Sequence, residues 1–462
     1  MSVTMPTAQA AGHSWSSHIR ETLLLGIPLI GAQLAQQGIN ATDIVILGQL
    51  SAVDLAAAVL ATQYFFTIFI FGSGLAIAVM PMVADAYGRG DEVAVRRSMR
   101  MGMWASLIYG VLVLPLFIWS ETILLAMGQE VDVAEHAAHY LHIVGFAMFP
   151  AQLFFVLRSL VSATGRAGIV LWATVAMLAL NAVLAYVLVL GHLGLPQLGI
   201  RGAAIAALAI QCTGFLILAV YIERDAELCR YRLFTRFWRP DWPALREVVA
   251  LGLPIGVSVL AEVSMFTVSS VLMGQFGAVP LAAHGIAIQL SSITFMVPLG
   301  LSQAGTVRVG RFHGAGDRVN LKRASIVVMI VAFLFALASG LSFALFPMAL
   351  ASLFIDTGLP EAPAVLAYAM PLMLVAALFQ LMDGGQVTLN GLLRGLKDAR
   401  IPMVLVLIAY WVVGLPLAWL LAFPLGLEGI GIWIGFLLGL GSAAVMLGFR
   451  LAHLLRAEHA AG

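Results

Sequence analysis

Twelve long apolar stretches constrain the fold of this chain more than any other feature of its sequence. Each is close to the roughly 20 residues that a helix needs to cross the hydrocarbon core of a bilayer. A segment inside a bilayer must satisfy its own backbone hydrogen bonds, so these stretches are predicted to be helices of an all-α integral membrane protein. The predicted spans are residues 22–47, 55–83, 99–120, 137–157, 169–190, 201–222, 246–272, 281–307, 324–346, 363–391, 401–422 and 427–450.

The composition supports this class. Only 10% of the 462 residues are charged and 61% are hydrophobic, whereas soluble domains carry about 25% charged residues. The net charge of +1 does not favour a nucleic-acid partner. The sequence has no glycine-rich nucleotide-binding loop, so we expect neither ATP nor an organic cofactor. The first 19 residues lack an apolar core, and no cleavable signal peptide is expected.

The two halves of the sequence resemble each other, with a constant offset over the first two spans of each half and a slightly different one over the later spans. Gly26 aligns with Gly252, and Gly88 aligns with Gly314. Six spans per half is an even number, so both halves begin on the same side of the membrane. They are predicted to form two six-helix lobes with pseudo-two-fold symmetry about the membrane normal, and a cleft between them is expected to hold the cargo. The predicted division is an N-terminal tail 1–21, an N-lobe 22–222, a linker 223–245, a C-lobe 246–450 and a C-terminal tail 451–462.

The basic residues predict the orientation. All but one of the 24 Lys and Arg residues lie at the termini, in even-numbered loops, or within a turn of those regions, the exception being Arg201. Acidic residues such as Glu130 and Asp356 occupy the odd-numbered loops instead. Cytoplasmic loops carry an excess of Lys and Arg. Both termini and the linker are therefore predicted to be cytoplasmic, with the first span acting as an uncleaved anchor.

Three acidic residues lie well inside predicted spans: Asp43, Glu262 and Asp383. A charge at the bilayer centre costs about 2.5–3.5 kcal/mol on insertion scales, and such residues face a bundle interior or a wet cavity. A purely structural ion pair is the alternative. It needs a basic partner, and we expect no Lys or Arg inside a span. We therefore expect the three acids to be functional.

Polar side chains at helical spacing accompany these acids. Two of the acids belong to the C-lobe, where carboxylates in a dry environment repel each other and attract a cation or a proton. We expect Na⁺ to bind at Glu262 and Asp383, with neighbouring oxygens as further ligands. His284 is expected either to join this site or to be a structural group. The polar companions are Gln36 and Asn40 near Asp43, and Gln380 and Gln386 near Asp383.

With these motifs the chain resembles the multidrug and toxic compound extrusion (MATE) transporters, in their bacterial NorM-type branch. The motifs are Thr42-Asp43, Gly252-Leu253-Pro254 followed by Glu262, Met382-Asp383, and Arg394-Gly395-Leu396-Lys397-Asp398. The resemblance implies a V-shaped, two-lobed antiporter of the bacterial inner membrane, and not an enzyme. It implies export of cationic, often aromatic, drugs and dyes in exchange for Na⁺ or H⁺.

The resemblance also assigns residues. Glu262 and Asp383 match the cation-site acids of the C-lobe, and Asp43 matches the acid of the N-lobe. Asn181 matches an asparagine that relatives place near that N-lobe acid. Phe379 stands where some relatives carry a tyrosine, and offers a cation its ring face without a hydroxyl.

Three other functions remain open at this point. A proton-coupled drug antiporter would use the same acids. A flippase for a lipid-linked precursor shares the superfamily, but it needs arginines in its cavity, which we do not expect here. An intramembrane aspartyl protease needs two facing aspartates, and this chain offers a Glu and an Asp in its second half. We expect a monomer.

Overall fold

The computed structural model describes residues 14–192, 194, 196–235, 237–356 and 358–460. The outer parts of the two predicted tails, 1–13 and 461–462, lie outside these residues. The described residues form helices and no strands. Within this part of the chain, twelve helical spans are long and apolar enough to cross a membrane, which confirms the predicted class and number of spans.

The first six spans are built from seven helices. The fourth span is broken in its middle by a 3₁₀ turn, Gly145–Ala147, and a short helix, α4 (Ser120–Ala126), lies before it. α1 begins at Trp15, so the described residues 14–21 of the predicted tail mostly belong to the first helix. The spans are α1 (Trp15–Leu47), α2 (Ala52–Gly88), α3 (Glu92–Ile118), α5 (Val131–Val144) with α6 (Met148–Ala163), α7 (Ala167–Leu190) and α8 (Gly199–Arg224).

The second six spans are also built from seven helices, with one span interrupted. A π-helical segment, Ile408–Gly414, interrupts the eleventh span, and a short helix, α12 (Pro347–Ala351), follows the ninth. α9 begins inside the predicted linker, at Trp242. The spans are α9 (Trp242–Gly274), α10 (Ala278–Gly314), α11 (Arg318–Leu345), α13 (Ala362–Gly395), α14 (Arg400–Leu407) with α15 (Leu415–Ala422), and α16 (Glu428–Ala460).

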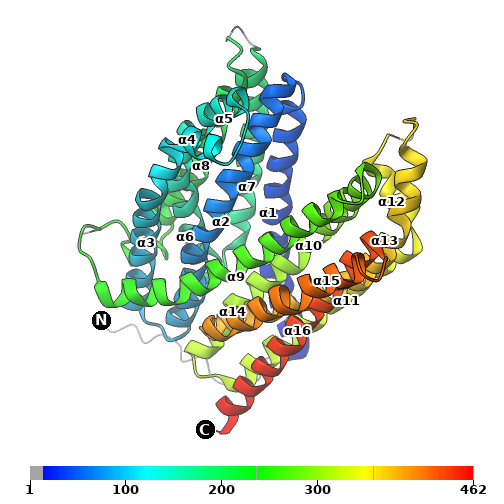
Figure 1. Ribbon diagram of the computed structural model, residues 1–462. Coiled ribbons are helices and arrows are strands. Elements are labelled where there is room, and N and C mark those ends of the chain that lie inside the picture. Colours follow the sequence, from blue (N-terminus) through cyan, green and yellow to red (C-terminus); the bar gives the residue numbers. More distant parts are fainter. Residues whose placement is uncertain (1–13, 193, 195, 236, 357, 461–462) are drawn as a thin grey trace, which may run out of the picture.

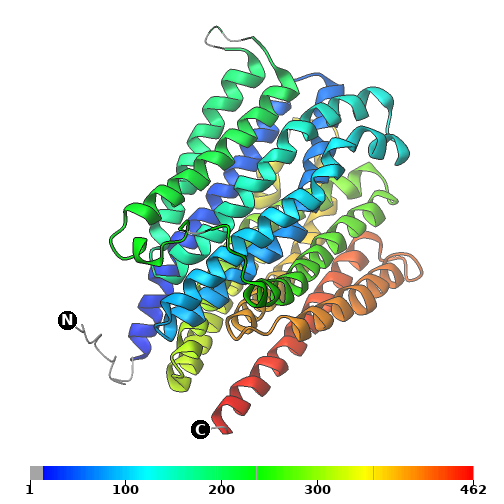
Figure 2. The ribbon, with the colours of Figure 1, turned by 90° about the vertical axis from the view of Figure 1, so that its left-hand side faces the viewer.

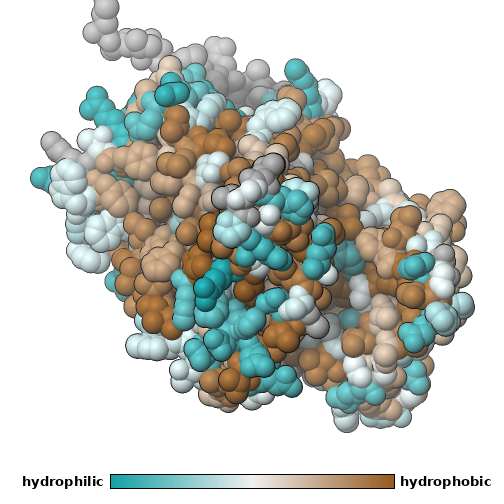
Figure 3. All heavy atoms as spheres, turned by 90° about the horizontal axis from the view of Figure 1, so that it is seen from above, coloured by the Kyte–Doolittle hydropathy of each residue, from teal (hydrophilic) through white to brown (hydrophobic). Residues whose placement is uncertain are grey.

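The helices form two lobes arranged as a V (Figure 1). The N-lobe contains α1–α8 and the C-lobe contains α9–α16. The lobes meet at the end of the molecule where α2, α10 and α13 finish and where α1 begins. We call this the closed end. At the other end, which we call the open end, the lobes diverge, and a groove separates them when the molecule is seen from above (Figure 3).

Small residues let the lobes approach each other closely. α1 and α2 of the N-lobe pack against α9 and α10 of the C-lobe. A Cβ atom on Gly74 would collide with the backbone of Gly256, and one on Gly314 would collide with the backbone of Asp85. Lipid offers no hydrophobic drive for helix association, so close backbone contact of this kind is how membrane helices pack tightly.

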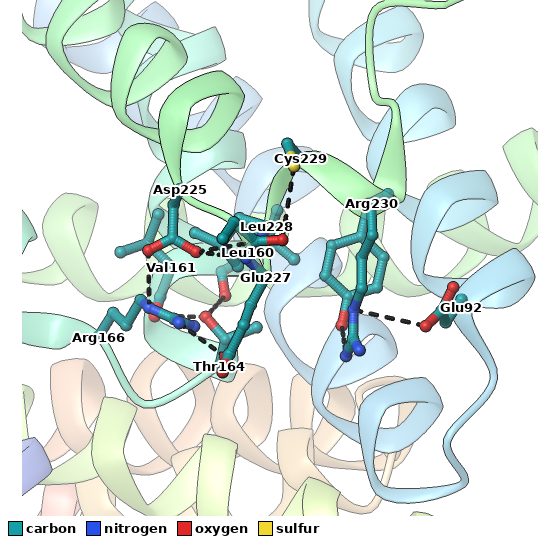
Figure 4. A network of polar contacts seen from close by, with 12 residues as sticks. Glu92, Leu160, Val161, Thr164, Arg166, Asp225, Glu227, Leu228, Cys229 and Arg230 are labelled. Atoms are coloured by element: carbon teal, nitrogen blue, oxygen red, sulfur yellow. Dashed lines mark hydrogen bonds and ion pairs between the residues drawn. The ribbon is translucent and has the colours of Figure 1, made fainter. Parts of the chain in front are cut away.

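The linker between α8 and α9 lies across the side of the N-lobe (Figure 2). The side chain of Arg100 donates to the carbonyl of Leu233 at 2.9 Å, and the indole of Trp104 donates to the carbonyl of Phe237. Ion pairs fasten the first part of the linker: Arg166 pairs with Asp225 and Glu227, and Arg230 pairs with Glu92 (Figure 4). The connection between the lobes is therefore anchored to the N-lobe.

Candidate functional site

A pocket of about 400 Å³ lies between the two lobes. The N-lobe contributes Gln63 and Phe66 from α2, and α9, α10 and α13 of the C-lobe contribute the other walls. Acidic and aromatic side chains line it together, and none of its lining residues among the described ones is basic. The C-lobe residues are Glu262, Val263, Phe266, Thr267, Ser270, Ile288, Ser291, Ser292, Phe295, Met296, Phe379 and Asp383.

The pocket brings together the two acids of the second half. Glu262 comes from α9 and is half-buried, whereas Asp383 comes from α13 and is 4% exposed. The two carboxylates lie close enough to repel each other electrostatically. Repulsion between buried carboxylates favours the binding of a proton or a cation.

Several buried polar atoms of the C-lobe, Asp383 Oδ1 among them, have no hydrogen-bond partner among the described residues. They are Asp383 Oδ1, Gln380 Nε2, both side-chain polar atoms of Gln386, Ser291 Oγ and the hydroxyl of Tyr410. Gln380 accepts one bond, from the Thr294 hydroxyl at 3.0 Å. Buried polar groups in native proteins are nearly always paired with protein, water or an ion. The oxygen atoms in this group are of the kind that binds a small hard cation, and those of Ser291 and Asp383 belong to residues that line the pocket.

Two residues near the acids were not assigned to this site from the sequence. Arg394, in the last turn of α13, is near enough to Glu262 for a favourable charge interaction. Tyr410 is buried in the π-helical segment, and its hydroxyl has no hydrogen-bond partner among the described residues. Segments of this kind are frequent at functional sites, because the extra residue re-aims a side chain. Arg394 belongs to a motif that is visible in the sequence. Its proximity to Glu262 could not be predicted, because it depends on how α13 packs against the helices around it.

Aromatic rings form the other wall of the pocket. Phe379 is 1% exposed and packs edge-on against Phe266, with ring centroids 6.2 Å apart. It also packs against Trp433 and Phe436. The faces of such rings attract organic cations, and the rings also pack against flat apolar groups.

His284 does not line the pocket. It is buried behind the pocket wall, where its Nε2 lies 3.1 Å from the hydroxyl of Ser270. The indole Nε1–H of Trp433 donates to its Nδ1 at 3.2 Å. Because the indole is only a donor, Nδ1 must be the acceptor and Nε2 carries the proton. His284 thus positions Ser270, which lines the pocket, and does not itself reach the space between the acids.

The N-lobe acid forms a separate site. The amide Nδ2 of Asn181, on α7, donates to Asp43 Oδ1 at 2.8 Å. Asn181 is buried, Asp43 and Gln36 are half-buried, and Asn40 is exposed. The structure therefore brings Asp43 and Asn181 together, as the resemblance implies, but neither lines the pocket at Glu262 and Asp383.

The expectation that no basic side chain lies inside a span is wrong. Arg158, in α6, is 5% exposed and bridges the lobes, with its guanidinium bonded to Gln33 of α1 and Gln303 of α10. Arg308, in α10, is also buried and pairs with Glu21 at 2.9 Å. The apolar stretches predicted from the sequence stop short of these residues, whereas the helices continue through them.

Polar contacts also hold the closed end together. Asp85, near the end of α2, is 1% exposed and pairs with Lys397 at 2.7 Å and with His313 Nδ1 at 2.9 Å. Asp85 belongs to the N-lobe and both partners belong to the C-lobe. An ionic contact thus spans the two lobes on the side opposite the open groove.

Curated relatives resemble this chain along almost its whole length. The probable multidrug resistance protein NorM of Agrobacterium fabrum is 56% identical over 99% of this chain and 98% of its own length. The protein of the same description from Rhizobium meliloti is 57% identical over 97% of this chain and 96% of its own length.

Solved structures share the fold. A crystal structure of MATE in complex with MaL6 superposes with a TM-score of 0.87, at 22% identity, over 96% of this chain and 97% of that one. A multidrug resistance MATE family transporter of the MOP superfamily, in an outward-facing conformation, gives a TM-score of 0.85, at 21% identity, over 96% of both chains. The MatE family model matches residues 28–187 and 254–420. The chain therefore belongs to the MatE family, whose members are membrane transporters and not enzymes.

Proposed function

We propose that this protein is a secondary active multidrug efflux antiporter, which exports cationic, aromatic compounds in exchange for Na⁺. One observation carries the proposal: the inter-lobe pocket combines two carboxylates, Glu262 and Asp383, with the rings of Phe66, Phe266 and Phe379. Carboxylates attract a cation and the rings bind its flat apolar part. The relatives described as multidrug resistance proteins support the same function.

The coupling ion is proposed to compete for the same acids. Asp383 Oδ1 and the amide oxygen of Gln386 lack partners among the described residues, and Ser291 lines the pocket. Hard cations take oxygen ligands of this kind, whereas a proton needs only one carboxylate. This favours Na⁺ over H⁺. Antiport then requires that binding of the ion and the drug oppose each other, a coupling that is typically about 1–3 kcal/mol.

The flippase alternative is less consistent with the pocket. Because Arg158 lies inside a span, an absence of arginines can no longer be used as evidence against a flippase. However, the described lining residues include two acids and no base, and such a pocket would repel the polyanionic head group of a lipid-linked precursor. The pocket charge, and not the absence of arginine, is what argues against a flippase.

The orientation and surroundings follow the basic residues. We propose that the closed end, with Arg89, Arg318 and Lys397, faces the cytoplasm of a bacterial cell, and that the groove opens to the outside. The protein would act in the inner membrane as a monomer, with small cationic molecules and the bilayer as partners, and without ATP.

Transport of a fluorescent organic cation under separate gradients tests the proposal. In inverted vesicles that contain the protein, an imposed Na⁺ gradient at equal pH should drive accumulation of the dye. A pH gradient without Na⁺ should drive little. Accumulation driven by the pH gradient alone would make the protein a proton antiporter, and no accumulation under either gradient would refute antiport of this dye class.

A further inference from the structure

We propose that Arg158 is a binding site for the carboxylate of zwitterionic substrates, reached when the lobes separate at the closed end. This rests on the proposed function, because it names a second chemical group that the exported molecules carry. The pocket at Glu262 and Asp383 recognises a cation. Arg158 would recognise an anion at another place on the inter-lobe surface.

The environment of Arg158 is unusual for a guanidinium. The side chain is 5% exposed, and its partners among the described residues are neutral: Gln33 Oε1 at 3.0 Å, Gln303 Oε1, and the ring of Phe155. Its Nε–H has no hydrogen-bond partner among the described residues. No described Asp or Glu forms an ion pair with it. A buried cation without a counter-charge is costly, and in a membrane it marks a functional site by default.

The two amides that cover Arg158 come from different lobes. Gln33 lies on α1 of the N-lobe, as Arg158 does on α6, whereas Gln303 lies on α10 of the C-lobe. If the lobes separate, Arg158 loses its hydrogen bond to Gln303. More of the N–H groups of its guanidinium are then without an acceptor. A planar guanidinium binds a carboxylate through two parallel hydrogen bonds, which is the pairing that fits this charge and shape best.

A polar stripe connects Arg158 to the N-lobe acid. Gln33, Gln36, Asn40 and Asp43 lie on one face of α1, and Gln33 is the member that contacts Arg158. With a rise of 1.5 Å per residue, Gln33 and Asp43 are about 15 Å apart along the helix. A molecule with an amine at one end and a carboxylate at the other can therefore interact with opposite charges along a single helix face.

The test uses a matched pair of ligands. A zwitterionic rhodamine with a free carboxylate and its methyl ester share the same cationic ring system and differ only in the negative charge. Fluorescence anisotropy with the purified full-length protein measures the affinity for each dye. Replacement Arg158→Gln should weaken binding of the zwitterion about tenfold or more, the range for hydrogen bonds to charged groups, and leave the ester within about twofold.

Two further measurements keep the proposal open to refutation if Arg158→Gln fails to fold. Replacement Arg158→Lys keeps the charge but loses the bidentate geometry, so it should weaken the zwitterion selectively. In the unmodified protein, benzoate should compete with the zwitterion and not with the ester. Arg166→Gln, which removes an arginine from a pair with Glu227 outside the lobe interface, should change neither affinity.

If the Arg158 variants lose affinity equally for both dyes, or lose affinity for neither, the proposal is overturned. Competition by inorganic phosphate but not by benzoate would assign Arg158 to a phosphate-bearing ligand such as a lipid and would also overturn it. Dye binding and ion-driven transport are independent readouts. A protein that distinguishes the two dyes through Arg158 but shows no gradient-driven accumulation would contradict antiport while leaving the anion site intact.

Discussion

Lys397 of the C-lobe and Asp85 of the N-lobe are joined by an ion pair of 2.7 Å at the closed end of the molecule. Asp85 is 1% exposed and also contacts His313. Next to this contact, Gly314 lies against the backbone of Asp85 without room for a side chain. The contact therefore joins charge pairing to close backbone packing across the two lobes, and it must break if the lobes are to open at this end.

Neutralising Asp85 should shift the protein toward opening at the closed end. Asp85→Asn removes the buried carboxylate from the contact between the lobes and leaves Lys397 with only the more distant carboxylate of Glu247, at 3.6 Å, as an ion-pair partner. Spin labels at the exposed positions Val93 and Val319, at the starts of α3 and α11, should report a larger population of long distances. Arg450→Gln, which breaks a pair within the C-lobe, is the control. Unchanged distances in Asp85→Asn would show that the other contacts between the lobes, such as the close glycine packing and the pair of Arg308 with Glu21, hold this end without it.

Neutralising the pocket acids should abolish ion-driven release of a bound dye. Glu262→Gln and Asp383→Asn each remove the charge that the coupling ion needs, while the rings of Phe266 and Phe379 can still bind the dye. Release of a prebound dye on addition of Na⁺ at fixed pH, in purified protein, measures the effect. Asp54→Asn, which alters an acid at the start of α2 and outside the pocket, should release dye as the unmodified protein does. Normal release from both pocket variants would place the coupling site elsewhere.

The contribution of Asp43 to efflux should depend on its hydrogen bond with Asn181. Asn181 donates to Asp43 at 2.8 Å, and a hydrogen bond to a charged group is worth about 1.5–3 kcal/mol. Asp43→Asn should impair efflux of cationic dyes at near-normal expression, and Asn181→Ala should impair it in the same direction. Asn181→Asp places two acids together and should be worse than Asn181→Ala. Efflux at the unmodified rate in Asp43→Asn would mean that Asp43 only packs the N-lobe.

Labelling should reveal the orientation. In a background with Cys212 and Cys229 replaced by serine, an impermeant maleimide applied to intact cells should reach a cysteine at Glu130 or Asp356. It should not reach one at Arg239, in the linker. All three positions are exposed, so access depends on the side of the membrane and not on burial. Labelling at Arg239 in intact cells would invert the topology.

The contact between Arg97 and Asp241 should make a small, acid-sensitive contribution to stability. Arg97 Nη2 donates to Asp241 Oδ1 at 3.0 Å, and the guanidinium holds the pKa of the Asp241 carboxyl below its usual range. A lowered pKa in the folded state stabilises the fold above the unfolded pKa of about 3.9, and the gain is lost as the pH falls through the folded value. At neutral pH the pair should contribute about 1 kcal/mol or less.

Thermal unfolding of Asp241→Asn against pH checks this. The variant should be slightly less stable than the unmodified protein near pH 7, with the difference vanishing in acid. Asp241 also caps α9 by accepting from the amide of Ala244 at 3.2 Å, so Asp241→Ala should lose about 1 kcal/mol more. A difference for Asp241→Asn that persists in acid would show that geometry, and not charge, sets its effect.

Hydropathy and residue type were sufficient to predict the class, the number of spans and the three acids inside them. Hydropathy over about 20 residues decides whether a helix crosses a bilayer, because each spanning segment must satisfy its own backbone. The acids stand out for a similar reason: a carboxylate inside an apolar stretch is costly wherever the helix is later packed. These properties are local to each segment, so the twelve helices and Asp43, Glu262 and Asp383 could be identified without a structure.

Which of these groups lie together depends on helix packing and could not be read from the sequence. Glu262 and Asp383 lie on helices far apart in the sequence and share a pocket only because α9 and α13 face it. His284 is turned behind the pocket wall by its bonds to Ser270 and Trp433. Arg158 follows directly after the end of the predicted span 137–157, and only the packing of α1, α6 and α10 places it between the lobes. Helical spacing predicts which side chains share a face, whereas the face that meets a partner is set by helix packing across the whole chain.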